Sequence, residues 1–239
     1  MPYSLSITDP SQHWSKSTRC RRLIALCALT TGLLTVATAA RAGELKGKVR
    51  LRSSLPVQTA AINPYPGTLG GGAEAPAHQP GSSPAEVVIF IEGVSGTRSP
   101  RSDNQKLHQV SRSFQPRVIG ITVGETVEFP NMDLVFHNVF SYSKTKRFDL
   151  GHYGKGKSKS VTFDKPGLVK VFCDIHSTMS AFIYVADTPY ITQPGKDGSY
   201  SIKDVPEGTY TVRVWHPEHG ESSDVVTIGN GATRHDINM

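Results

Sequence analysis

Short apolar segments recur at regular intervals between residues 109 and 187, and this spacing constrains the fold more than any other feature of the chain. The segments between them carry Gly, Pro, Asn or Asp, which favour turns. The expected strands are QVSRSF (109–114), VIGITV (118–123), TVEFPN (126–131), HNVFSY (137–142), KSVTF (159–163), LVKVFCD (168–174) and AFIYVAD (181–187). No amphipathic helix of useful length is expected after residue 42, so the pattern predicts an all-β sandwich.

The first 42 residues have the pattern of a signal peptide. Basic residues at 16–22 precede the apolar run LIALCALTTGLLTVATAA (23–40), and small residues offer cleavage after Ala39, Ala40 or Ala42. The alternative is a membrane anchor, but the run is short and contains several threonines. We therefore expect an exported, periplasmic protein without stable membrane insertion.

Charge excludes one class of partner. Removing the expected signal peptide takes five Lys/Arg and one Asp from totals of 26 and 20, which lowers the net charge from +6 to about +2. The basic character of the chain belongs largely to this segment, so we expect no binding to nucleic acid.

The same cleavage leaves Cys173 as the one remaining cysteine. A lone cysteine in an exported protein is a buried apolar residue, a reactive thiol, an intermolecular bridge or a metal ligand. In LVKVFC, Val169, Val171 and Cys173 share one face of the expected strand, so the thiol should point into the core. His176 and Met179 follow at three-residue spacing, on the turn after that strand.

Upstream, His137 and Val139 share a face of HNVFSY, so His137 should also point inward. A thiolate, two imidazoles and a weak thioether form the ligand set of blue-copper electron-transfer sites. His137, Cys173, His176 and Met179 are therefore the candidate ligands of one copper ion that alternates between Cu(I) and Cu(II). The alternative is a buried core thiol with polar residues in the turn after it.

Two stretches, RVIGITVGETVEFPNMDLVFHNVF and VTFDKPGLVKVFCDIHSTMSAFIYVAD, resemble the cupredoxins, in the plastocyanin and amicyanin branch. The resemblance covers about residues 105–187. It implies a Greek-key β-sandwich, the same four copper ligands, and Asn138 bracing the site with its backbone N–H near the thiolate. The short Cys-x2-His-x2-Met loop resembles that of amicyanin, although prolines around the histidine are absent here.

The tail, DGSYSIKDVPEGTYTVRVWHPEH, resembles the second half of a carboxypeptidase-regulatory-like (transthyretin-like) sandwich. LKGKVRLR (45–52) and AEVVIFIEGV (85–94) can supply its first half. We therefore expect a signal peptide (1–42), a first part of this sandwich (43–94) with a flexible loop at 62–84, a cupredoxin domain (95–187) and a second part (188–239). Two consecutive domains are the alternative. The combination resembles exported proteins described as methylamine-utilisation-like.

Three further histidines are possible metal ligands. His152 lies in a Gly-rich loop, and His216 and His219 lie in the turn WHPEHG without a third ligand nearby, so we expect all three on the surface. No arrangement typical of a catalytic site stands out.

The sequence thus predicts a carrier of single electrons, not an enzyme, with a c-type cytochrome or a dehydrogenase as its exported redox partner. A copper carrier or assembly factor, a domain of a copper oxidase or nitrite reductase, and a structural sandwich with an inactive site remain alternatives.

Overall fold

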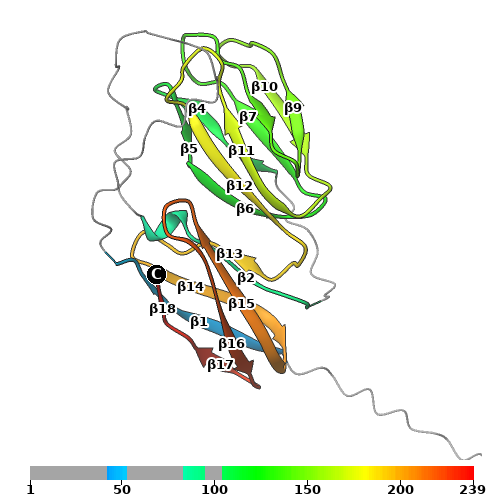
Figure 1. Ribbon diagram of the computed structural model, residues 1–239, viewed down its shortest axis with the longest axis vertical. Coiled ribbons are helices and arrows are strands. Elements are labelled where there is room, and N and C mark those ends of the chain that lie inside the picture. Colours follow the sequence, from blue (N-terminus) through cyan, green and yellow to red (C-terminus); the bar gives the residue numbers. More distant parts are fainter. Residues whose placement is uncertain (1–41, 53–82, 95–103) are drawn as a thin grey trace, which may run out of the picture. The chain divides into compact units, whose positions relative to one another are not determined.

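The computed structural model describes residues 42–52, 83–94 and 104–239 (Figure 1). The expected signal peptide, apart from its last residue, and most of the expected loop 62–84 lie outside these ranges and stay predictions. Within the described ranges, the helical element is a three-residue turn, η1 (Pro84–Glu86), and no helix there has the length and apolarity needed to cross a membrane.

One β-sandwich contains the candidate ligands. Its sheets have the strand orders β10-β7-β3 and β6-β12-β11-β8-β9, and a small hairpin, β4-β5, accompanies them. The strands are β3 (Gln105–Lys106), β4 (His108–Val110), β5 (Ser113–Gln115), β6 (Val118–Thr122), β7 (Thr126–Pro130), β8 (Phe140–Tyr142), β9 (Arg147–Asp149), β10 (Ser158–Thr162), β11 (Gly167–Phe172) and β12 (Ser180–Ala186). The all-β prediction is confirmed.

The core of this sandwich follows the alternation of its strands. Val169 and Val171 of β11 are completely buried while Lys170 between them is exposed, and Cys173 directly after the strand is 2% exposed. Burying each such apolar side chain contributes about 1.5–3 kcal/mol. Phe129 of β7 and Phe163, which directly follows β10, fill the same core from the other sheet.

One expected strand is a hairpin. QVSRSF divides into β4 and β5, because Ser111 and Arg112 both adopt positive φ, 51° and 54°, and reverse the chain. Consecutive left-handed residues form the tight turn that suits antiparallel strands. The alternation in this stretch was too short to distinguish one strand from two.

A second β-sandwich combines both ends of the described chain. Its sheets have the orders β14-β1-β17, with β18 also paired to β1, and β13-β2-β15-β16. The strands are β1 (Ala42–Arg50), β2 (Val88–Ile91), β13 (Ile191–Thr192), β14 (Ser199–Pro206), β15 (Gly208–His216), β16 (Gly220–Ile228), β17 (Ala232–Arg234) and β18 (Ile237–Asn238).

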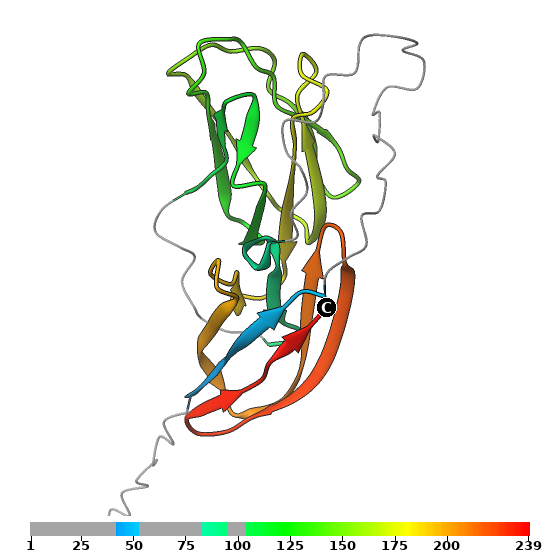
Figure 2. The same cartoon turned by 90° about the vertical axis from the view of Figure 1, so that its left-hand side faces the viewer.

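Strands from opposite ends of the chain lie side by side in this second sandwich. β1 pairs with β14 in antiparallel and with β17 and β18 in parallel register, so that the blue and red strands adjoin in Figures 1 and 2. β2 pairs with β15. The prediction that β1 and β2 pair with the tail strands and not with β6 or β7 is confirmed, while the exact domain boundaries stay predictions.

The close packing of β1 depends on glycine. A Cβ atom at Gly47 would lie 1.8 Å from the backbone oxygen of His235, far inside contact distance. The residue at this position can therefore carry no side chain without displacing the backbone of the C-terminal segment.

The two sandwiches share a third apolar cluster, which contains Val88 and Phe90 of β2, Val118 of β6 and Trp215 of β15. Arg117, just before β6, donates to both carboxylate oxygens of Glu86, at 2.9 and 2.8 Å, and to Glu218 at 2.7 Å. An arginine held this way by two carboxylates links the strands of one sandwich to the turns of the other.

Candidate metal centre

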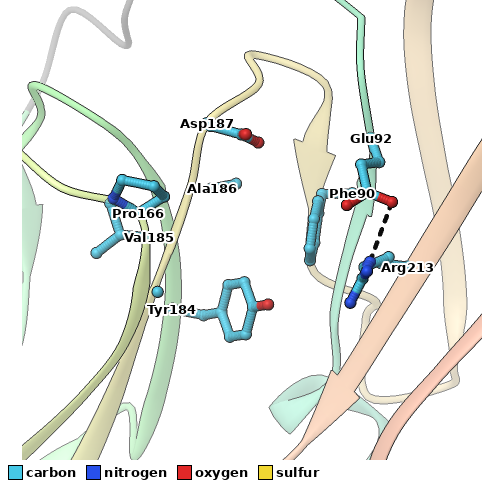
Figure 3. Close-up of a pocket in the computed structure, with 9 residues that line it drawn as sticks. Phe90, Glu92, Pro166, Tyr184, Val185, Ala186, Asp187 and Arg213 are labelled. Atoms are coloured by element: carbon cyan, nitrogen blue, oxygen red, sulfur yellow. Dashed lines mark hydrogen bonds and ion pairs between the residues drawn. The ribbon is translucent and has the colours of Figure 1, made fainter. Parts of the chain in front are cut away.

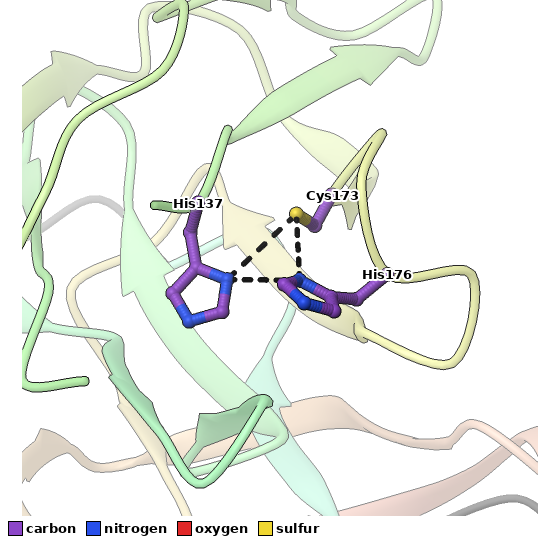
Figure 4. A group of neighbouring side chains, drawn as sticks. All are labelled: His137, Cys173 and His176. Atoms are coloured by element: carbon purple, nitrogen blue, oxygen red, sulfur yellow. Dashed lines mark hydrogen bonds between the residues drawn. The ribbon is translucent and has the colours of Figure 1, made fainter. Parts of the chain in front are cut away.

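Three of the four predicted ligands come together. The Nδ1 atoms of His137 and His176 are 3.1 Å apart, and the Cys173 Sγ atom lies 4.0 Å from the first and 3.8 Å from the second (Figure 4). Among the described residues, this group is the one place where three His, Cys or acidic side chains gather their ligand atoms so closely.

The triangle has the size of a metal site. A point equidistant from its three corners lies about 2.1 Å from each atom, as the circumscribed circle of the three separations requires, and metal–nitrogen and metal–thiolate bonds are ~2.0–2.3 Å long. Two ring nitrogens 3.1 Å apart also need a proton or a cation between them. A soft thiolate with two imidazoles suits copper.

Strand ends place the first two ligands. Cys173 follows β11, whose last residue Phe172 pairs with Phe140 of β8. His137 precedes β8 and exchanges backbone hydrogen bonds with Tyr153, at 3.2 and 2.9 Å. Because β8 and β11 are neighbours, a histidine before one strand and a cysteine after the other meet at the same edge. Their large sequence separation is bridged by this pairing.

Asn138 contacts the sulfur atom of Cys173. Its backbone N–H lies 3.5 Å from the Cys173 sulfur, as expected, and its side-chain amide donates to Asp149 at 2.7 Å. The N–H of Gly151 and this amide hold the pKa of Asp149 below its usual range. The backbone donor of Asn138 keeps the sulfur at a fixed place beside the strand.

Asp133 is a site residue that the sequence reasoning missed. Its carboxylate lies 2.9 Å from His137 Nε2 and also accepts the backbone N–H groups of Ser111 and Arg112, at 2.7 and 2.8 Å. Partial burial opposes ionisation, but the hydrogen bonds from Arg112, His137 and Ser111 outweigh it and lower the pKa of Asp133. With the proton of His137 kept on Nε2, the lone pair of Nδ1 is free for a metal.

Asn131 is a second missed residue, and it shapes the loop before His137. Its completely buried amide donates to the backbone oxygens of Val135 and Tyr153, and its oxygen accepts the N–H of Asp133 at 2.8 Å. The only signal in the sequence was the asparagine that ends the expected strand TVEFPN.

Met179 ends the ligand loop, with its backbone hydrogen-bonded to the loop and its side chain in the core. Its N–H donates to the oxygen of His176 at 3.0 Å, and the N–H of Cys173 lies 3.3 Å from the oxygen of Met179. Met179 is 1% exposed and belongs to the same apolar cluster as Cys173. Its assignment as the fourth, axial ligand stays a prediction.

The two histidines of the triangle differ in exposure to solvent. His137 is completely buried, whereas His176 is partly exposed. Met179 is buried beneath the loop, and the exposed apolar residues of the two ligand-bearing loops are Met132, Leu134, Val135, Phe136 and Ile175.

His152 is exposed, as predicted, and its Nε2 lies 3.0 Å from Asp174 of the ligand loop. His216 was expected on the surface, and this expectation was wrong. The imidazole of His216 is completely buried beside Glu86 and His219, and this burial lowers its pKa to about 4.

The hydrogen bonds of His216 exclude it as a metal ligand through Nε2. Its Nδ1 accepts the N–H groups of Glu218 and His219, at 3.1 and 3.3 Å, so the ring proton of the neutral imidazole is on Nε2. A protonated nitrogen has no lone pair for a metal. The short motif WHPEHG does not reveal that His216 is buried, because the residue beside it, Glu86, is distant in sequence.

A shallow pocket lies apart from the ligand group, with Phe90, Tyr184 and Arg213 in its wall (Figure 3). Arg213 pairs with Glu92 at 3.2 Å and with Glu221 at 3.1 Å. None of the four predicted ligands lines it. Arg213 and Glu92 in its lining neutralise each other, and we assign the pocket no function.

Comparison with known proteins relates two parts of the chain to families. Residues 103–186 match the family described as copper binding proteins, plastocyanin/azurin family. Residues 179–235 match the family described as polysaccharide lyase family 4, domain II, and not the carboxypeptidase-regulatory-like description suggested by the sequence. This second match begins at Met179, directly before β12, so it includes a strand of the first sandwich.

Similar solved structures include the copper-containing nitrite reductase NirK of Thermus scotoductus SA-01, at 29% identity and a TM-score of 0.35. That match covers 39% of this chain and 24% of the reductase, so the chain spans about a quarter of its length. A purple cupredoxin from Nitrosopumilus maritimus matches at 22% identity, over 35% of this chain and 100% of its own, with a TM-score of 0.32.

Amicyanin from Paracoccus versutus matches at 22% identity, over 41% of this chain and 97% of its own, with a TM-score of 0.34. No curated protein matches the chain. The family match over residues 103–186, together with the β-sandwich and its His137–Cys173–His176 group, supports a cupredoxin domain in this part of the chain.

Proposed function

We propose that this protein is an exported, periplasmic carrier of single electrons with one type 1 copper ion, and not an enzyme. The observation that carries the proposal is the triangle of His137, Cys173 and His176, whose size suits a bound metal. When bound, copper supplies a centre that gains and loses one electron without releasing its ligands.

The chain's own residues would keep this centre rigid. Asp133 orients the ring of His137, and the N–H of Asn138 lies beside the sulfur of Cys173. These contacts come from separate segments of the chain. The ligand atoms therefore have little freedom to move when the charge of the copper ion changes. Fixed ligands favour repeated electron transfer over metal release.

His176 is the proposed electron port. It is the partly exposed member of the triangle, and Ile175 beside it is 49% exposed. Electron transfer needs a close approach of the partner, and an exposed imidazole bordered by apolar side chains permits one. A c-type cytochrome or an exported dehydrogenase fits as the partner class.

Titration of the protein with Cu(II) tests the metal centre. We expect binding of one copper per chain and an intense visible band from thiolate-to-copper charge transfer. Cys173→Ser should abolish the band while the circular dichroism spectrum of the β-sandwich is unchanged. A band that persists in Cys173→Ser would overturn the ligand assignment.

Repeated reduction and reoxidation, followed by a copper count, tests the electron-carrier role. An electron carrier retains its copper through every cycle. Loss of copper on reduction, or transfer of copper to an apo acceptor without a redox change, would instead favour the copper-carrier alternative.

A further inference from the structure

A row of basic residues lies on one face of the first strand of the second sandwich. Alternate positions of β1 and of the two residues after it carry exposed cations: Lys46, Lys48, Arg50 and Arg52. Leu45 and Val49, on the opposite face of the strand, are buried in the core. Because alternate residues of a strand are about 6.8 Å apart, the four cations form a row about 20 Å long.

The neighbouring strands extend this row without covering it. Arg234 of β17 is exposed and is the register partner of Lys46, so both side chains stand on the same face. On the other side of β1, Ser201 and Ser199 of β14 pair with Lys46 and Lys48, and their side chains are too short to cover a lysine. We call the four cations of the row, together with Arg234, the basic face.

Carboxylates balance only part of this charge. Asp236 lies 3.7 Å from Arg50 and 3.0 Å from Arg234, so one carboxylate serves two guanidinium groups. Glu44, at the start of the row, accepts the hydroxyl of Ser201 at 2.6 Å. The other three cations of the basic face have no carboxylate of the described residues within ion-pair distance. Five cations and these two carboxylates leave a net charge of +3.

The basic face differs in sign from the rest of its sandwich. Residues 42–52, 83–94 and 187–239 together contain eight Lys/Arg and eleven Asp/Glu, a net charge of −3. Subtracting the +3 of the basic face leaves −6 for the remainder of these residues. Positive charge is therefore segregated onto one sheet face and not scattered over the surface, which is typical of a surface that meets an anionic partner.

This face is not used in the contact between the two sandwiches. The apolar cluster that they share takes its second-sandwich residues from β2, β13 and β15, and none from β14, β1, β17 or β18. These last four strands also contain none of the exposed large hydrophobic side chains of the described residues. A partner that contacts the basic face therefore meets charged and hydroxyl groups alone.

We propose that the basic face is a peripheral docking surface for a membrane rich in anionic phospholipid. This inference goes beyond the proposed electron-transfer function and does not require copper; it needs only an exported protein that meets a phospholipid surface. Clusters of four or more Lys/Arg adsorb to anionic bilayers, and each cation adds to the binding. Because no apolar side chain is available for insertion, the adsorption is reversible and weakens as salt is added.

A flat lipid surface fits the basic face better than a soluble anionic polymer. The cations spread over two neighbouring strands of an open sheet, and the short serines beside them form no wall that would enclose a single polymer chain. Adsorption through this sheet also leaves the candidate metal ligands free, because they belong to the other sandwich.

A second stretch rich in lysine, residues 144–159, is less suited to this contact. Its charges follow a strand, a loop and another strand instead of one sheet face. Lys146 pairs with Asp164 at 2.9 Å, and the ammonium group of Lys159 contacts the backbone oxygen of Leu150. This stretch therefore provides the matched control.

Co-sedimentation of the copper-free protein with lipid vesicles tests the proposal. We expect binding to phosphatidylglycerol vesicles at low salt, no binding to phosphatidylcholine vesicles, and release as salt shortens the screening length to ~8 Å or less. Lys46→Gln/Lys48→Gln should weaken the binding by about tenfold or more while the circular dichroism spectrum is unchanged. Lys155→Gln/Lys157→Gln removes the same charge from the other stretch and should bind like the unmodified protein.

Lysine acetylation of the unmodified protein gives a second measurement that needs no variant. Lys46, Lys48, Lys155 and Lys157 are all exposed, so all four should react in the free protein. Phosphatidylglycerol vesicles should protect Lys46 and Lys48 from acetylation and leave Lys155 and Lys157 reactive, as mass spectrometry of the peptides reports.

The outcomes distinguish a failed docking surface from a failed electron carrier. Equal binding to both lipids, equal losses in the two double variants, or protection of Lys155 and Lys157 instead of Lys46 and Lys48 would overturn the docking surface. Displacement from the vesicles by soluble polyglutamate at an equal concentration of negative charge would overturn the assignment to a membrane. All of these measurements use the copper-free protein, so their failure leaves the electron-carrier proposal intact, and a failure to bind copper leaves the docking surface intact.

Discussion

Replacing Asp133 by Asn tests whether a carboxylate outside the ligand set maintains the metal centre. Three donors converge on this carboxylate: the N–H groups of Ser111 and Arg112, and His137 Nε2. An amide of the same size offers one oxygen and places an NH2 group against the remaining donors. The volume of the side chain is conserved, so any effect comes from the lost charge and the mismatched hydrogen bonds.

The magnitude follows from the burial of each donor. Ser111 and Arg112 are exposed, so water can replace the bonds to their N–H groups at small cost. His137 is completely buried, and a buried donor without a partner costs about 1–3 kcal/mol. We expect the free energy of unfolding of the apo-protein to fall by this amount, and copper affinity to fall by about 10- to 100-fold.

Competitive chelator titration measures the copper affinity, and chemical denaturation followed by circular dichroism measures stability. Asp164→Asn is the control, because Asp164 is exposed and pairs only with Lys146 among the described residues. If Asp133→Asn keeps both the copper affinity and the stability of the unmodified protein, the carboxylate does not position His137 and our reading of the site is wrong.

Three further predictions concern other parts of the molecule. Met179→Leu, which conserves volume and apolarity, should leave the fold and the charge-transfer band in place but shift the reduction potential of the copper; an unchanged potential, measured by redox titration, would remove Met179 from the ligand set. His216 has a pKa of about 4 in the folded protein, below the ~6.5 of the unfolded chain, so its contribution to stability is complete above pH 6.5 and is lost as the pH falls toward 4. Denaturation of the apo-protein should therefore show an acid-induced loss of up to about 3 kcal/mol that is missing in His216→Gln, and equal pH profiles would contradict the buried neutral state. Gly47→Ala should destabilise the second sandwich by about 1–3 kcal/mol or more through the backbone of His235, whereas Gly229→Ala, where the added Cβ meets nothing, should have little effect on the melting temperature.

The sequence by itself determined the class of the fold and which three side chains would come together at the candidate metal centre. Strand alternation is a local property, so the inward positions of Val169, Val171 and Cys173 could be predicted from LVKVFC alone. The spacing of Cys173 and His176, with His137 on an inward position upstream, was enough to predict the triangle. The pairing of β1 and β2 with the tail strands was predicted from the resemblance of the tail to half of a sandwich, which needs two further strands to complete it.

The tertiary structure decided what surrounds these residues. The contact between Asp133 and His137 depends on the hairpin at Ser111 and Arg112, which is distant in sequence and whose positive φ values no periodicity reveals. The burial of His216 depends likewise on η1 and on the segment before β6. Local patterns fix which face of a strand is apolar, but they do not fix which distant segment covers it.

The surface around the candidate metal centre also depends on tertiary contacts that local sequence patterns do not reveal. The apolar letters of MDLVF suggest burial when read alone, yet Leu134 and Phe136 are exposed, because the amide of Asn131 holds this loop by its backbone and turns these side chains outward. Lys157 could be read from the sequence, but its position beside this loop comes from the backbone hydrogen bonds that Asn131 forms with Gly156 and Lys157. Composition is local and contacts between loops are not, so the sequence determined which side chains can form the triangle, and the tertiary structure decided which residues surround it.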